Sequence, residues 1–414
     1  MSASVKKMRT FFFIFKSQRE KVKRSSRAPV LDRKEIPDGI PWKGIFLFIF
    51  RKIDLLQILT ILALFAIGLA FIYGTGQQAG ATSSILWQKQ LQYFILGSIV
   101  WLFLSFTDYR YMGFLSILAY PVAIFLLVYV LFNGTRYYGA TRWISIGGYS
   151  LQPSELAKVA VILTISRFLS LKKVNINHPL WMLAAIVLVG LPFFLIYKEP
   201  DLGTALVMLA AVAAIIFAAR LKWRYILFLL ILIPVIALGG YFSMKEYQRD
   251  RVKVFLNPEL DTKNRGWSQL QAELAVGQGG LTGKGFMQGT HNALGYLPQT
   301  VSNSDFIFPV IAEEKGLLGS YILVGLYMLL LFTILRTALV VADDFGRYIC
   351  IGAAVTFFMH SAVNIGMCIR LAPVTGLPLP LVSYGGTFLL ATMCYLGLVH
   401  SVYIHSSKKS IFDL

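Results

Sequence analysis

Residues 53–73 read IDLLQILTILALFAIGLAFIY, an apolar run whose one charged residue, Asp54, stands near its start. A helix of about 20 apolar residues spans the hydrocarbon core of a bilayer, so this run predicts a transmembrane helix. It is too long for the apolar core of a cleavable signal peptide, and no convincing cleavage site follows it. The run therefore indicates an integral membrane protein.

The rest of the chain agrees with this class. Of its 414 residues, 57% are hydrophobic and 14% are charged, whereas a soluble chain carries roughly 25% charged residues. The apolar runs predict an all-α polytopic membrane protein of about ten transmembrane helices. The predicted spans are 53–73, 91–106, 112–132, 154–171, 180–197, 202–219, 224–244, 308–341, 347–370 and 384–405. The eighth and ninth exceed one crossing, so we expect them to tilt or to extend beyond the hydrocarbon.

Lys and Arg lie mainly on one side of the predicted helices. They are concentrated in residues 1–52 and in short loops on the same side, which carry Lys172, Lys173 and Arg220. The positive-inside rule then places both termini in the cytoplasm. The large loop 245–308, between the seventh and eighth spans, is predicted to be extracytoplasmic.

The segments outside the spans are simple. Residues 1–42 form a basic cytoplasmic tail that we expect to be disordered, residues 43–406 form the membrane domain, and residues 407–414 form a short cytoplasmic tail. The net charge of +19 does not require a nucleic-acid partner, because a tail attracted to anionic lipid headgroups explains it. The three cysteines lie in apolar runs without zinc or disulfide spacing, which predicts packing roles.

Charged residues at membrane depth form the first candidate site. Glu155 and Lys158, three residues apart, share one helix face. They form either a self-neutralising pair or the floor of an outward cavity where Lys158 meets phosphate. Asp201 follows Pro200 at a helix start, where a carboxylate either caps free backbone N–H groups or serves a cavity or metal. Because a charge at a helix centre costs at least ~2.5 kcal/mol, we expect pairing or a wet cavity.

The outer loop contains QGGLTGKG at residues 278–285. A phosphate loop would need Gly at position 278 and Ser or Thr at position 285, so this is not one. A flexible, turn-rich loop is the first interpretation. A diphosphate contact by Lys284 and backbone amides is the second.

Asp305 is a single acid where the loop meets the next apolar run. A carboxylate at this junction is placed for chemistry on a lipid-linked substrate, or it caps the helix that follows. Near the C-terminus, residues 373–380 (PVTGLPLP) and 382–386 (VSYGG) predict a broken segment before the last span. Such backbone survives at membrane depth only when it is buried in protein or lines a cavity.

These segments together resemble the SEDS family of polytopic membrane proteins, over residues 52–405. The matching motifs are RWI at 142–144, QPSE at 152–155 with Lys158, PDLGT at 200–204, GG, GKG and GT within 279–290, and DFIF at 305–308 with EE at 313–314. Residues 363–367 (VNIGM) and 373–380 resemble the elongation-type RodA branch. The segment 297–305 departs from the family by being longer and by carrying Gln299 where Glu is usual.

The resemblance implies a peptidoglycan glycosyltransferase of cell elongation and shape maintenance. Such proteins polymerise lipid II, a disaccharide-pentapeptide on undecaprenyl diphosphate, into β-1,4 glycan strands at the inner (cytoplasmic) membrane of a bacterium. A class B penicillin-binding protein, a transpeptidase, is the implied partner. The resemblance places the catalytic acid on Asp305 and cavity residues on Glu155, Lys158 and Asp201.

One carboxylate suffices for this chemistry. An inverting displacement at a sugar carbon that bears a diphosphate needs a base for the attacking hydroxyl, but no nucleophilic carboxylate. Positive charge for the diphosphate would come from Arg142, Lys158 or Lys284. A divalent cation, Mg²⁺ or Mn²⁺, at Asp305 or Asp201 is a further candidate. We expect no organic cofactor.

Two other classes compete with this interpretation. A lipid II flippase would use the same cavity, but it must expose polar sites alternately to both sides. The charged residues described above cluster toward the outer face, which favours an enzyme. A non-catalytic scaffold would leave those charges unexplained.

Overall fold

The computed structural model describes residues 53–79, 85–137, 140–147, 149–225, 227, 249, 265–298 and 301–406. Nine of the ten predicted spans coincide with helices. These are α3 Leu55–Ala79, α4 Leu86–Phe106, α5 Tyr109–Asn133, α6 Pro153–Leu169, α7 Pro179–Lys198, α8 Leu202–Ala218, α13 Ile307–Val340, α14 Asp344–Cys368 and α15 Gly386–His405. The predicted seventh span, 224–244, lies almost entirely outside the described residues, as do the tails 1–42 and 407–414.

Seven of the described helices are long and apolar enough to cross a membrane, namely α3, α4, α5, α7, α13, α14 and α15. Helix α8 is apolar but shorter. Helix α6 has 17 residues and carries the charged pair Glu155 and Lys158. The chain is therefore a helical, polytopic membrane protein, as the sequence predicts.

Aspartate side chains begin three of these helices. Asp108, Asp201 and Asp343 are the N-caps of α5, α8 and α14, and each accepts a hydrogen bond from a backbone N–H of the first turn. A helix start leaves four N–H groups unsatisfied, and a cap removes one of them at low cost. The capping interpretation of Asp201 is confirmed.

A small antiparallel sheet, which was not predicted from the sequence, joins α5 to α6. Its strands are β1 Thr135–Tyr137, β2 Ala140–Ile146 and β3 Tyr149–Leu151, in the order β1-β2-β3. Thr135 pairs with Trp143, and Ser145 pairs with Ser150. Strand β2 carries Arg142.

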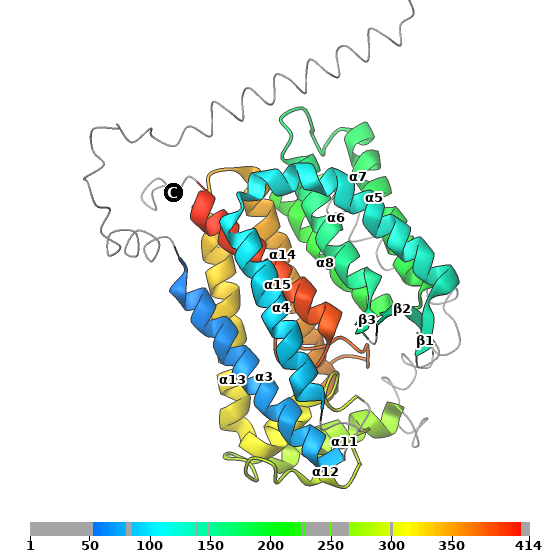
Figure 1. Ribbon diagram of the computed structural model, residues 1–414. Coiled ribbons are helices and arrows are strands. Elements are labelled where there is room, and N and C mark those ends of the chain that lie inside the picture. The colour runs from blue at the N-terminus through cyan, green and yellow to red at the C-terminus, as the bar shows by residue number, and fades with distance from the viewer. Residues whose placement is uncertain are drawn as a thin grey trace, which may run out of the picture. The chain divides into compact units, whose positions relative to one another are not determined.

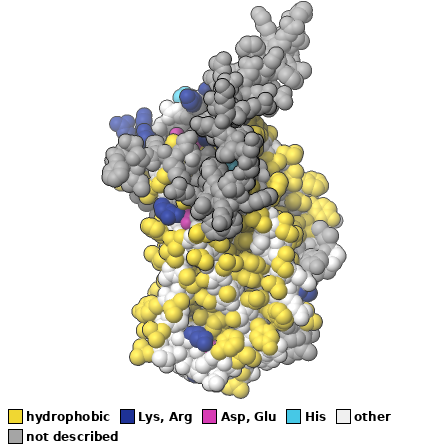
Figure 2. Space-filling model, turned by 60° about the vertical axis from the view of Figure 1, so that its left-hand side comes forward, with side chains coloured by type: hydrophobic (Ala, Val, Ile, Leu, Met, Phe, Trp, Pro, Cys, Tyr) yellow, Lys and Arg dark blue, Asp and Glu magenta, His cyan; other side chains and the backbone are white. Residues whose placement is uncertain are grey.

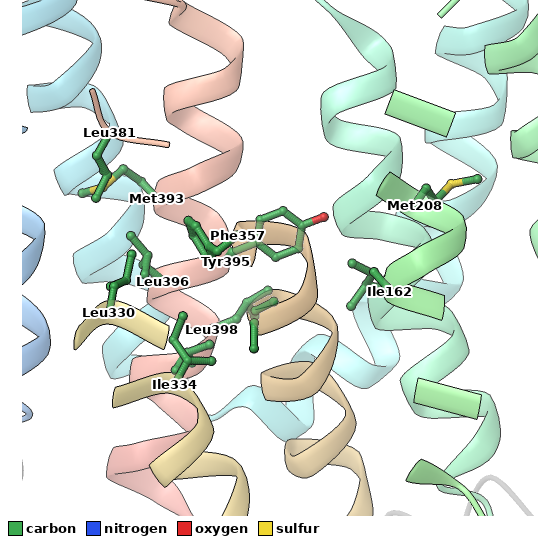
Figure 3. Close-up of a cluster of buried hydrophobic side chains, with 14 of the residues drawn as sticks. Ile162, Met208, Leu330, Ile334, Phe357, Leu381, Met393, Tyr395, Leu396 and Leu398 are labelled. Atoms are coloured by element: carbon green, nitrogen blue, oxygen red, sulfur yellow. The ribbon is translucent and has the colours of Figure 1, made fainter. Parts of the chain in front are cut away.

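The helices pack closely where their side chains are small. A Cβ atom on Gly97 of α4 would lie 2.9 Å from Met393 of α15, and one on Gly397 of α15 would lie 3.0 Å from Leu104 of α4. Small residues let helix backbones approach in a bilayer, where van der Waals packing and not hydrophobicity drives association. Figure 3 shows Tyr395 of α15 beside Phe357 of α14. The centroids of their rings are 6.3 Å apart.

The helices define two ends of the membrane domain. At one end the start of α3 contacts the ends of α13 and α15, through an Asp54–Arg336 ion pair and a Gln57–His400 hydrogen bond of 2.8 Å. At the other end α3 contacts the loop that precedes α13, since Gln78 accepts a hydrogen bond from Asn292. Helices α11 (Arg265–Gln278) and α12 (Thr290–Ala293) lie at this second end (Figure 1). The Asp305 region is thus opposite to the C-terminal end of α15.

Candidate active site

The segment 369–385 between α14 and α15, here called the connecting segment, is non-helical, and its residues 379–383 are buried. Side chains of neighbouring helices satisfy its backbone. Tyr327 donates to the carbonyl of Pro380 at 2.7 Å, and Gln90 donates to the carbonyl of Ser383 at 3.0 Å. The predicted broken segment is therefore confirmed, and protein partners replace the missing helical hydrogen bonds, as membrane depth requires.

Asp305 lies against this segment. Its carboxylate oxygen Oδ2 is 3.2 Å from the position that a Cβ atom on Gly376 would occupy, and Gly376 is exposed with φ +73°. Asp305 itself is half-buried. Phe306, and not Asp305, is the N-cap residue of α13, so the N-cap interpretation of Asp305 is wrong. The carboxylate lies beside backbone that has no side chain to cover it.

Asn364 of α14 holds this contact in place. Its amide nitrogen donates to the backbone carbonyl of Asp305 at 2.9 Å and to that of Leu377 at 2.7 Å. Asn364 is fully buried, so water does not compete for these two bonds. One carboxamide thereby ties the residue that carries the acid to the connecting segment that faces it.

Lys158 forms a buried ion pair with Glu155, 3.0 Å apart, in which the side chains are 1% and 4% exposed. Its ammonium also lies 2.9 Å from Nε2 of His360, and Nδ1 of His360 lies 3.2 Å from the carbonyl of Pro378. This arrangement is satisfied when neutral His360 donates through Nδ1 and accepts through Nε2. A cavity of ≈ 10 Å³, about one water in size, adjoins the pair.

Arg142 fixes the connection between α7 and α8. Its guanidinium donates to the carbonyls of Glu199, at 2.9 Å, and Pro200, and its Nη1 is 3.6 Å from Oδ1 of Asp201. Asp201 also accepts from Gln152 at 3.0 Å. The following Gly203 packs against the connecting segment, because a Cβ atom there would lie 3.2 Å from Leu377. Arg142 thus holds the start of α8, and Gly203 in its first turn packs on the segment that faces Asp305.

Glu199, in the same connection, is fully buried, and neither carboxyl oxygen has a hydrogen-bond partner among the described residues. Burial, with a smaller contribution from Asp201, raises the pKa of Glu199 from 4.5 to about 9. The carboxyl group is therefore protonated at neutral pH. A neutral acid avoids the cost of burying an unpaired charge.

This pKa predicts a pH-dependent stability that Glu199→Gln removes. An acid with a raised pKa binds its proton more tightly in the folded protein, so stability falls as pH rises from 4.5 to about 9. We expect the wild type to lose thermal stability across this window relative to Glu199→Gln, as measured by unfolding in detergent. Glu273→Gln, at a partly exposed carboxylate, is the control. A difference that stays constant with pH would contradict the prediction.

Lys284 forms an ion pair with a different acid, Glu313. Its ammonium lies 2.7 Å from Oε1 of Glu313, and it donates to Gln278 at 2.7 Å and to Thr290 at 2.8 Å. Glu313 is fully buried and also accepts from the backbone of Thr290. The loop is rich in turns, as the first interpretation predicts, and these contacts tie it to α13.

The loop is inserted into a break in α13. At Gly316 the backbone leaves helical geometry, with φ 65° and ψ −161°. The carbonyls of Glu313 and Glu314 accept from Lys284 and Gly285, while the amides of Leu317 and Leu318 donate to Gly280 and Leu281. Loop backbone thus replaces the helical bonds that the break removes. The predicted eighth span, 308–341, is too long for one crossing. The break at Gly316 explains this length, because it divides the 34-residue helix α13 into two parts.

The close approach predicts a matched pair of glycine substitutions. A Cβ atom on Gly279 would lie 2.0 Å from the carbonyl oxygen of Ala312, whereas one on Gly277 meets nothing within 4 Å. We expect Gly279→Ala to destabilise the protein by about 1–3 kcal/mol through overpacking. Gly277→Ala, within helix α11, should be neutral or stabilising. Thermal unfolding in detergent compares them, and equal effects would show that the loop does not need this contact.

The structure brings most of the predicted site residues around the connecting segment. Asp305 meets it at Gly376, Lys158 reaches it through His360, and Asp201 adjoins it through Gly203. Lys284 belongs to a separate cluster with Glu313. The links through His360 and Asn364 were not predicted from the sequence. The available signal was their spacing of four residues, which places two polar side chains on one face of an apolar helix.

The described residues offer little for a metal ion. Within the described part of the chain, no group of three or more His, Cys, Asp or Glu side chains is placed to hold one. Asp201 does not fit a metal ligand, because Thr204, Gln152 and Arg142 engage its two oxygens. Asp305 would supply one carboxylate, so substrate phosphate and water would have to complete the shell of Mg²⁺.

The fold and this site define a polytopic membrane protein with a carboxylate at one membrane surface. Comparison with known proteins gives the family. The model of the family described as cell cycle protein, which covers FtsW, RodA and SpoVE, matches residues 53–408. The chain belongs to this family, which is the SEDS family that its motifs resemble.

Individual relatives agree with this assignment. The chain is 40% identical over 299 residues to the peptidoglycan glycosyltransferase MrdB of Escherichia coli K12, covering 70% of this chain and 78% of that protein. It is 30% identical to the peptidoglycan glycosyltransferase RodA of Treponema pallidum, covering 84% of this chain and 97% of that protein.

Solved structures are similar as well. A chain from a peptidoglycan synthase complex that coordinates polymerization and crosslinking matches with a TM-score of 0.73 and 30% identity, over 85% of this chain and 97% of that chain. The rod shape determining protein RodA of Thermus thermophilus matches with a TM-score of 0.63 and 28% identity, over 85% and 96%.

Proposed function

We propose that this chain is a peptidoglycan glycosyltransferase that polymerises lipid II into β-1,4 glycan strands during cell elongation. The observation that carries the proposal is the position of Asp305, half-buried beside exposed Gly376 at one end of the helices. The relatives described above are named peptidoglycan glycosyltransferases, which supports the same reaction here.

The reaction would use Asp305 as its base. The carboxylate takes the proton of an attacking sugar hydroxyl, the hydroxyl oxygen bonds to the anomeric carbon, and the bond from that carbon to undecaprenyl diphosphate breaks with inversion. General-base catalysis contributes ~10²–10⁴-fold, and the remainder comes from positioning. Asn364 holds the backbone of Asp305 next to the connecting segment, because it donates to the carbonyls of both Asp305 and Leu377.

Lys158, Arg142 and Lys284 differ in how accessible they are to the diphosphate of the substrate. Lys158 is 1% exposed and already bonded to Glu155 and His360, so its role is to hold the connecting segment. The side chains of Arg142 and Lys284 keep 19% and 28% exposure. Arg142 pairs with Asp201, two residues before Gly203, which packs on the connecting segment. We therefore assign the diphosphate contact first to Arg142. A divalent cation at Asp305 stays a prediction, since its remaining ligands would come from the substrate.

Location and partner complete the proposal. Asp54 and His400 lie at the end of the domain opposite to Asp305, so cytoplasmic termini would place Asp305 at the outer face of the inner membrane. Lipid II presents its sugars at that face. A class B penicillin-binding protein is the proposed partner, supported by the similarity to a chain from a synthase complex that couples polymerization to crosslinking.

Purified protein tests the enzyme against the alternative, a lipid II flippase. Detergent removes the two sides of the membrane, so a flippase has no measurable product there. We expect the wild type, with and without a class B penicillin-binding protein, to convert labelled lipid II into glycan strands that gel electrophoresis resolves. Absence of strands in both samples, from protein that remains folded, would favour the flippase.

A further inference from the structure

Helix α11, in the large loop, carries an exposed apolar stripe. Trp267, Leu270 and Leu274 follow one another at spacings of three and four residues, so they share one helix face. They are 40%, 38% and 43% exposed. Isolated apolar side chains on a surface are ordinary, but an aligned set marks a contact surface.

The opposite face of α11 is polar or small. It buries Ser268, Gln269, Gln271, Ala272 and Ala275. A helix that packs on a protein surrounded by water does the reverse and turns its apolar stripe inward. The inverted arrangement indicates that the exposed stripe meets an apolar medium.

Specific contacts fix the depth of α11. Gln269 donates to the carbonyls of Met367 and Ala372, each at 3.0 Å, and Glu273 pairs with Arg370 at 3.0 Å. These partners lie where α14 ends. Because α14 is one of the candidate membrane spans, α11 lies level with the end of a span. In Figure 1 α11 runs across the long helices instead of along them.

Exposed apolar side chains also occur in the segments that follow or contact α11. Beyond the C-terminal end of α11, Leu281 is 70% exposed and its carbonyl accepts from Leu318, which is 58% exposed. Leu318 leads into exposed Tyr321 and Ile322 of α13. On the α14 side, Leu371 is 76% exposed. Figure 2 shows how hydrophobic side chains cover a face of the helical domain.

We propose that α11 is an interfacial helix that inserts Trp267, Leu270 and Leu274 into the outer leaflet of the bilayer. Trp is enriched at this depth, where its ring is apolar and its N–H reaches water. Amphipathic helices bind membranes through such buried stripes. A lipid surface is favoured over a protein partner because α11 lies level with the end of a candidate span and exposed apolar residues follow it on α13, another candidate span. The inference is independent of the reaction that the protein catalyses.

Fluorescence quenching by lipids tests the proposal. In the full chain with Cys350, Cys368 and Cys394 replaced by Ala, single cysteines at positions 267, 270 and 274 are labelled with bimane. Ala293, exposed on α12, supplies the control position. The proteins are placed in phosphatidylethanolamine–phosphatidylglycerol nanodiscs whose acyl chains are brominated near the headgroup. We expect labels at 270 and 274 to lose most of their fluorescence, and the label at 293 to lose little.

Each outcome of this experiment either supports or overturns the insertion of α11 into the bilayer. Quenching at the stripe positions supports insertion, and a loss of lipid-quenchable tryptophan emission in Trp267→Phe supports it without any label. Equal, weak quenching at all positions overturns the proposal. Labels that remain unquenched by lipid but become shielded when a class B penicillin-binding protein is added also overturn it, because the stripe would then be a protein interface.

Discussion

Asp305→Asn is expected to lower the rate of glycan polymerisation by ~10²–10⁴-fold, the usual contribution of a general base. The amide keeps the shape of the carboxylate but cannot take a proton. The backbone carbonyl that accepts from Asn364 is unchanged, so the fold should persist. The loss should appear in kcat with little change in KM, since the missing interaction is formed only in the transition state. Single-turnover assays with labelled lipid II measure it.

A matched control separates the base from general effects of charge. Glu273→Gln removes a carboxylate from the same large loop, where Glu273 pairs with Arg370 and is 43% exposed. We expect it to retain wild-type polymerisation. If Asp305→Asn also retained full activity, while folded to the same extent, the base would lie elsewhere and the proposed mechanism would fail.

The sequence predicts best what the bilayer itself imposes. Each span must satisfy its backbone internally, so long apolar runs can form only helices, and nine of the predicted spans coincide with helices. Local rules also succeed. Asp201 caps α8 because a carboxylate beside free N–H groups needs no distant partner.

Contacts between distant segments were not predictable in this way. Lys158 meets His360, 202 residues away, and Arg142 meets the backbone of Glu199, 57 residues away. Neither pairing leaves a local periodicity, because each depends on which helices become neighbours. For the same reason, the sequence left Lys284 open between a flexible loop and a diphosphate contact, although Glu313 holds it in a fixed cluster.

Breaking the Glu155–Lys158 ion pair is expected to lower the free energy of unfolding more than any other substitution described above. The pair is almost completely buried, so Glu155→Leu or Lys158→Met leaves an uncompensated charge, at a cost of about 3–5 kcal/mol. The double variant removes both charges and should be far more stable than the sum of the two single effects predicts. Unfolding in detergent measures the coupling. Asp344→Asn, which breaks an exposed pair of the same spacing with Arg347, should cost at most about 1 kcal/mol.

The activity of the double variant distinguishes the two interpretations of this pair. A pair that only neutralises itself would leave polymerisation intact in the folded double variant. A pair that positions the active site acts through the Lys158–His360–Pro378 contacts, so removing it should lower kcat even though the protein folds. We expect the second result, because Pro378 and Gly376 belong to one connecting segment and Gly376 faces Asp305. A stable double variant with wild-type kcat would show that the pair serves folding alone.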